Sequence, residues 1–241
     1  MSEEFDLSSL SYDQFIAFFF DRPAPDSNEH LPSFPVERAE WEFSRPEVAV
    51  TYMTSMCKNF AAISREYSLG QLNQALWAII GLDFDLVQNL WDNSVSLRDR
   101  IDCIRSMYVV YSDFVAKSEA FPLENIFDMW WDLIAHNFWS QRDFFDRSAL
   151  REGRALKRID TGEVSKLDSD SRALLDAMFE TLRRILDLPD RRAQKFALHG
   201  LGHIHHPGVP DLVQGYIDKN RDGLTAEDLK WMEQCRDGKV L

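Results

Sequence analysis

Four of the six histidines lie close together, at positions 199, 203, 205 and 206. His199 and His203 are four residues apart, so a helix would place both imidazoles on one face, at a spacing that metal-binding helices use. His206 or Asp211 could supply a third ligand. The intervening Gly-Leu-Gly, however, lacks the glutamate that serves as general base in the zinc-protease helix motif.

A structural role explains the same histidines without a metal. The periodicity places His199 and His203 off the apolar stripe of their helix. Imidazoles near a helix C-terminus are also stabilised by the helix dipole. We therefore expect structural or solvent-facing histidines, with no metal and no cofactor. A metal-binding module or metal-dependent enzyme built on His199 and His203 is kept as the alternative.

The segment that begins at Asp218 is similar to the start of an EF-hand calcium loop. Asp, Asn and Asp occupy its first, third and fifth positions, and Gly223 occupies the sixth. The twelfth position needs a bidentate acid, but Leu229 stands there. A helix boundary explains the segment more simply, with Gly223 ending one helix and Thr225 capping the next. A calcium-responsive module at residues 218–228 is kept as a further alternative.

An aromatic helix is predicted to start near Pro122, ahead of a stretch rich in arginine. If part of it faces outward, its rings and the nearby guanidinium groups are the residue types that dominate protein interfaces. Core packing is the ordinary role for most such rings. The predicted partner-binding residues are Trp131, Trp139, Arg142, Arg151 and Arg154.

Hydrophobic spacing predicts an all-α fold, a multi-helix bundle of stacked helical hairpins with negligible sheet. Apolar residues recur every three or four positions, and no segment alternates them between hairpin turns. Capping boxes are predicted to start helices at Ser11 and Ser44, and another helix is predicted to start at Ser68. We expect a single helical domain, 1–241, in four parts: a short helix and Pro-rich arm (1–43), a main helical core (44–141), an irregular basic loop (142–167) and helical hairpins (168–241).

Residues 190–217 carry the one recognisable pattern. The phrase Ala-Leu-His-Gly-Leu-Gly at 197–202 ends a predicted helix, a turn follows at His206-Pro207-Gly208, and Pro210 can start a second helix. This resembles a HEAT repeat. The resemblance implies a stacked helical scaffold that binds partners, and small residues at Ala197 and Gly200 would let helices approach closely.

Composition is that of a globular protein, with 45% hydrophobic residues and a net charge of −13. Such a charge disfavours nucleic acid and anionic membranes as partners. No apolar run approaches the roughly 20 residues of a membrane helix. Three widely spaced cysteines, Cys57, Cys103 and Cys235, indicate reduced, buried thiols and a cytoplasmic location.

These observations favour a non-enzymatic scaffold that binds a protein partner through an acidic or an aromatic helix surface. Residues 1–50 contain eleven acidic and three basic residues, so a basic partner suits the acidic surface. The phosphate-binding loop, the nucleophile elbow and the dinucleotide-binding fingerprint are all missing from the sequence.

Overall fold

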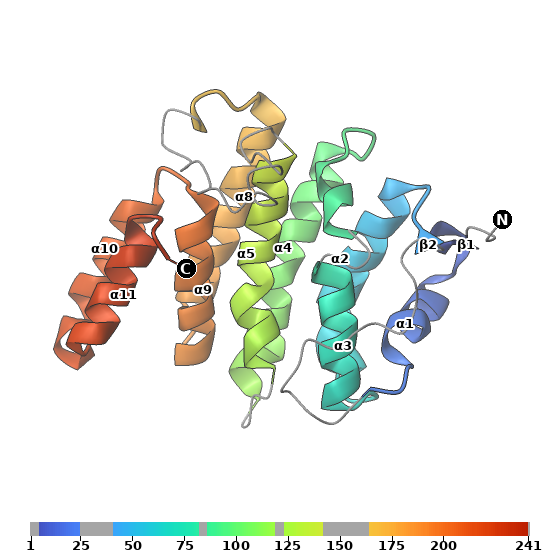
Figure 1. The fold of residues 1–241 in the computed structure, drawn as a ribbon, viewed down its shortest axis with the longest axis horizontal. Coiled ribbons are helices and arrows are strands. Elements are labelled where there is room, and N and C mark those ends of the chain that lie inside the picture. The colour runs from blue at the N-terminus through green and yellow to red at the C-terminus, as the bar shows by residue number, and fades with distance from the viewer. Residues whose placement is uncertain (1–4, 25–40, 82–85, 119–122, 142–163, 241) are drawn as a thin grey trace, which may run out of the picture. The chain divides into compact units, whose positions relative to one another are not determined.

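The computed structural model describes residues 5–24, 41–81, 86–118, 123–141 and 164–240 (Figure 1). The all-α prediction is confirmed, because the described elements are helices apart from one pair of two-residue strands. The chain divides into two compact units, one ending at Trp130 and the other beginning at Trp131. The predicted Pro-rich arm and basic loop lie mostly outside the described residues.

The first unit is built mainly on the packing of α2 against α4. Its elements are β1 (Phe5–Asp6), η1 (Leu7–Ser9), α1 (Tyr12–Phe20), β2 (Trp41–Glu42), α2 (Pro46–Ile63), α3 (Leu69–Ile80), η3 (Leu86–Trp91), α4 (Leu97–Asp113), η4 (Val115–Lys117) and the start of α5 (Glu124–Ser140). Aromatic rings fill this core, with Phe60 meeting Phe114 edge-on at a centroid distance of 5.0 Å. Cys57 and Cys103 are free thiols buried here, as expected, and burial raises the pKa of Cys103 to about 12.

A helix begins at or next to each of the three predicted starts, but the capping box predicted at Ser44 is wrong. Ser11 and Ser68 each form a complete capping box with the glutamine three residues on. At α2 the residue before the helix is Arg45, which makes no side-chain cap, while Pro46 occupies the first turn. The Ser44 hydroxyl instead donates to Asp6 Oδ2 at 2.6 Å. The hydroxyl that the capping box would need is therefore bound to a carboxylate 38 residues away in the sequence.

Asp6 joins the N-terminal segment to the start of α2. Its carboxylate accepts hydrogen bonds from the backbone N–H groups of Ser8 (2.8 Å) and Ser44 (3.1 Å) and from the Ser44 hydroxyl. Burial alone would raise the pKa of Asp6, but the hydrogen bonds from Ser44 and Ser8 together lower it to about 2. The two-residue strands β1 and β2 pair in parallel beside this contact, Phe5 opposite Trp41.

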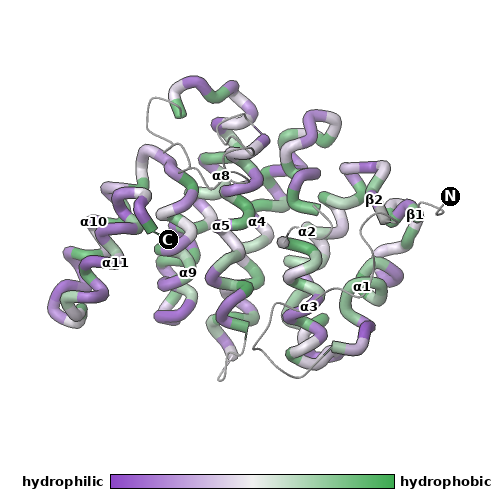
Figure 2. Tube along the Cα trace, in the orientation of Figure 1, coloured by the Kyte–Doolittle hydropathy of each residue, from purple (hydrophilic) through white to green (hydrophobic). Residues whose placement is uncertain are grey.

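In the second unit, α9 packs against α8 and α11, and α10 packs mainly against α11. Its elements after the remainder of α5 are α8 (Ser169–Leu186), α9 (Arg191–Ile204), α10 (Val209–Asn220), η5 (Arg221–Gly223) and α11 (Ala226–Arg236). The two helices of the HEAT-like segment are confirmed as helices, whereas their membership of a repeat stays a prediction. Figure 2 shows that α11 is mostly hydrophilic, in contrast to the hydrophobic second half of α1.

One glycine sets how closely α9 approaches its neighbours. A Cβ atom added at Gly200 would lie 2.5 Å from Trp131 Cβ and 2.9 Å from Leu182 Cδ2. Real Cβ atoms do not approach other atoms so closely, so only glycine permits this packing. The close helix approach predicted at this residue is confirmed.

Within the described ranges, no helix is both long and apolar enough to cross a lipid bilayer.

Gly200→Ala should lower the free energy of unfolding by about 1–3 kcal/mol, because the added methyl group overlaps Trp131 and Leu182. Gly215→Ala is the matched control. It lies in α10 with no atom within 4 Å of the new Cβ, and it should raise stability by about 0.5–1 kcal/mol. Urea denaturation followed by circular dichroism measures both changes. Equal stability of the two variants would contradict the close approach.

Asp6→Asn should change how stability depends on acid. Because the pKa of Asp6 in the folded chain lies below the ordinary value of 3.8, its ionisation stabilises the folded chain above pH 4. That contribution is lost as the pH falls from about 4 to about 2. The urea midpoint of the wild type should therefore fall more steeply than that of the variant over this range. Parallel curves would show that Asp6 makes no such contribution.

Candidate functional site

The second unit brings two of the predicted histidines and one carboxylate into a row. His199 Nε2 lies 3.1 Å from His203 Nε2, with the two rings nearly perpendicular at 88°. His203 Nδ1 lies 3.1 Å from Asp132 Oδ1, on α5. The i, i+4 spacing on α9 places both imidazoles on one face, as the sequence predicted, whereas Asp132 was not anticipated.

The prediction that these histidines lie off the buried face of the helix is wrong for His199, which is only 5% exposed. The reason is that α9 has α8 and α11 against it and Trp131 against Gly200, so more than one apolar stripe is covered. The His203 side chain keeps 20% of its surface exposed. A buried imidazole needs a hydrogen-bonding partner, and the neighbouring imidazole supplies one.

The direction of the hydrogen bonds in the row follows from the carboxylate. An ionised carboxylate only accepts, so His203 Nδ1 carries a hydrogen and donates it to Asp132. With both rings neutral, the hydrogen between the two Nε2 atoms belongs to His199, which donates it to His203 Nε2. If that hydrogen moves to His199 Nδ1, both Nε2 atoms present lone pairs to a cation.

His205 does not join the row, because it ends α9. Its backbone takes the left-handed conformation with φ of 52°. Burial, and secondarily the nearby His203, lower the pKa of His205 to about 4. Its ring lies against Gly238 and edge-on to Trp139. His205 therefore serves as a neutral, packed cap.

His206 fixes the turn after α9. Its Nε2 lies 3.0 Å from Asp176 Oδ1, its Nδ1 accepts from the Gly208 N–H at 3.0 Å, and its ring stacks on Phe179. Because Nδ1 accepts, the hydrogen sits on Nε2, and the imidazole is neutral. Burial lowers the pKa of His206, and Asp176 opposes that shift.

In the part of the chain that the structure describes, no three His, Cys, Asp or Glu side chains are grouped to hold a metal.

Of the predicted partner-binding residues, the structure describes the two tryptophans. Trp131 and Trp139 are 0% and 1% exposed, so the outward-facing arrangement is wrong for both, and they pack in the core. Such large rings are excluded from water wherever neighbouring helices can cover them. Arg142, Arg151 and Arg154 lie outside the described residues.

The segment similar to a calcium loop is a helix boundary, as the simpler interpretation expects. The Thr225 hydroxyl accepts from the Asp228 N–H at 3.1 Å, and the Asp228 carboxylate accepts from the Thr225 N–H, which completes a capping box at the start of α11. Asp218 Oδ1 accepts from Gln214 Nε2 on the preceding helical turn. The acidic side chains at both ends of the segment thus have local hydrogen bonds.

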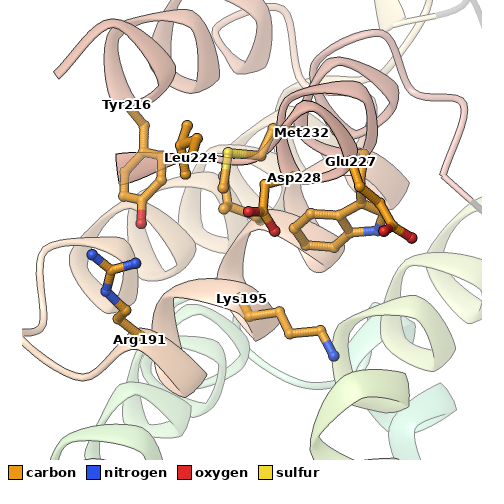
Figure 3. Close-up of a pocket in the computed structure, with 9 residues that line it drawn as sticks. Arg191, Lys195, Tyr216, Leu224, Glu227, Asp228 and Met232 are labelled. Atoms are coloured by element: carbon orange, nitrogen blue, oxygen red, sulfur yellow. The ribbon is translucent and has the colours of Figure 1, made fainter. Parts of the chain in front are cut away.

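A groove that the sequence did not indicate opens between α9, α10 and α11, with a volume of about 400 Å³ (Figure 3). Its walls combine two basic side chains, two acidic ones, two aromatic rings and three aliphatic side chains. The lining residues are Arg191, Lys195, Leu198, Tyr216, Leu224, Glu227, Asp228, Trp231 and Met232.

Charges of both signs line the groove on different helices. Arg191 and Lys195 are exposed, one turn apart on α9, and neither forms a salt bridge or hydrogen bond with any described residue. Glu227 and Asp228 lie in the first turn of α11. Hydrogen bonds from the Thr225 side chain and backbone lower the pKa of Asp228, so it is ionised at neutral pH.

Tyr216 contributes a neutral phenol to the groove. Its hydroxyl donates to Gln194 Oε1 at 2.8 Å. Burial raises the pKa of Tyr216, and the positive charge of Arg191 only partly offsets this rise. The sequence shows that Arg191 and Lys195 are four residues apart on one helix. Which helices lie opposite these two side chains depends on how α10 and α11 pack against α9.

Thr225→Ala should lower the free energy of unfolding by about 1 kcal/mol, because it removes the side-chain oxygen that caps α11. Calcium should leave the melting temperature of this variant and of the wild type unchanged, since the segment acts as a cap. Thermal melts with and without calcium test both expectations. A calcium-dependent rise that Asp218→Ala abolishes would restore the calcium-loop interpretation.

Comparisons with protein-family models, with curated proteins and with solved structures found no match for this chain. The geometry of the histidine row and of the groove is therefore the basis on which a function can be assigned.

Proposed function

We propose that this chain is a non-enzymatic helical scaffold that binds a short segment of a partner protein in the groove between α9, α10 and α11. The observation that carries the proposal is that apolar side chains and the basic pair Arg191 and Lys195 line one groove, and neither basic side chain forms a salt bridge or hydrogen bond with a described residue. Aromatic rings beside arginine are the residue types that contribute most to protein binding.

The size and shape of the groove suit a few side chains of a peptide. Its volume of about 400 Å³ falls within the range of ligand-binding clefts, roughly 300–1,000 Å³. Its walls are helices, so a bound segment would not have to order them. Trp231 and Met232 provide the apolar contact that a large side chain of the partner would bury.

The charges in the groove define what such a segment should contain. Arg191 is the first residue of α9, where the helix dipole adds to its positive charge, and both favour a carboxylate. A peptide with a large apolar residue beside an aspartate or glutamate therefore fits the groove. Glu227, which lines the groove from α11, favours a basic residue at the position of the peptide that lies next to it. The net charge of −13 repels acidic proteins at long range, so the partner as a whole should be basic.

Peptides selected from a random displayed library on the full chain should be enriched in a large apolar residue next to an acidic one. Trp231→Ala and Lys195→Glu should each weaken binding of a selected peptide by about tenfold or more, because one removes an apolar contact and the other repels its carboxylate. Fluorescence anisotropy with the labelled peptide measures the affinities.

Lys219→Glu is the matched control, since it makes the same charge change at an exposed position on α10 that does not line the groove. Its affinity should stay close to that of the wild type. Selected peptides that bind Lys195→Glu and the wild type equally well would exclude the groove as their binding site.

A further inference from the structure

We infer that His199 and His203 form a binding site for a divalent transition-metal cation such as Zn²⁺, with Asp132 holding His203 in the ligating orientation. This site is separate from the groove, and the inference does not depend on the proposed function. It rests on the distances between the three side chains and on the centroid distance and interplanar angle of the two rings.

The separation of the two Nε2 atoms is that of a pair of metal ligands. Imidazole nitrogens bind zinc at about 2.0–2.1 Å, so two of them on one ion lie about 2.9 Å apart for a right angle at the metal and about 3.3 Å for a tetrahedral one. The observed separation between His199 Nε2 and His203 Nε2 is 3.1 Å. A cation placed between them would need little rearrangement of α9.

The two rings are not collinear through their Nε2 atoms. A straight Nε2–H···Nε2 hydrogen bond at this separation would hold the ring centroids about 5.4 Å apart. Two imidazoles aimed at one shared zinc ion would hold them about 4.8 Å apart. The observed centroid distance is 4.7 Å, with the rings at 88° to one another. The observed centroid distance is thus closer to the value for two imidazoles on one zinc ion than to that for a straight hydrogen bond.

Asp132 occupies the position of a supporting carboxylate. Histidines that bind metals donate their other ring N–H to a carboxylate or carbonyl, which fixes the tautomer and makes the ligating nitrogen more basic. His203 Nδ1 makes this contact with Asp132 Oδ1 at 3.1 Å, which leaves Nε2 as the ligating atom. Binding then requires the hydrogen between the rings to move to His199 Nδ1, so that both Nε2 atoms present lone pairs.

Chemistry of the donors selects the class of metal. Two imidazoles suit zinc, copper or nickel, whereas magnesium and calcium prefer oxygen ligands. Since the described residues provide no third ligand, water or an added ligand would complete the coordination. The His203 side chain is 20% exposed, so one of the two rings borders solvent.

Zinc chloride titrated calorimetrically into the tag-free, chelator-treated full chain should bind at one equivalent. His199→Gln and His203→Gln should each weaken this binding by at least about tenfold, because each removes a ligand. Asp132→Asn should weaken it by about 10- to 100-fold. His205→Asn is the control: asparagine tolerates the left-handed backbone, so it removes a neighbouring imidazole without altering the pair. Circular dichroism checks that each variant is folded.

A nitrogen NMR measurement on the wild type keeps the test independent of variant folding. Zinc should shift the Nε2 resonances of His199 and His203 together at one equivalent. The inference is overturned if the wild type binds no zinc, if zinc shifts only other histidines, or if the double variant of His199 and His203 binds with unchanged affinity.

Discussion

The absence of a side chain at residue 200 is the constraint on which the second unit depends. The backbone of α9 lies directly against Trp131 and Leu182 at this point, where even a methyl group would overlap both. This contact brings the C-terminal half of α9 against α5, so that Asp132 reaches His203 and Trp139 reaches His205. A larger side chain would separate the helices and lengthen each of these contacts.

The two ends of α9 consequently have different chemistry. Its C-terminal half is enclosed, so the polar groups there make hydrogen bonds with one another, as in the row from Asp132 to His199. Its N-terminal half turns Arg191 and Lys195 toward a groove whose other wall is α11. One helix thus holds a largely buried polar row at one end and exposed charges that form no salt bridge at the other.

Local sequence rules predicted the helices well where the determining residues are neighbours in the chain. The capping residues Ser11, Ser68 and Thr225 interact with groups three positions on, so their roles follow from the sequence. The rule failed at Ser44, because its hydroxyl binds Asp6, 38 residues away. The same limit explains why Trp131 was assigned to a possible surface. A tryptophan side chain suits an interface as well as a core. Trp131 is buried because a neighbouring helix covers it, which the local sequence does not show.

By itself, the sequence determined the all-α class, several helix starts and the placing of His199 and His203 on one helical face, because each depends on spacing within one segment. Only the tertiary structure decided that Asp132 faces His203 and that α11 closes the groove beside Lys195. Those relations join residues separated by long stretches of chain. Their geometry depends on how closely whole helices can pack, which a single segment does not encode.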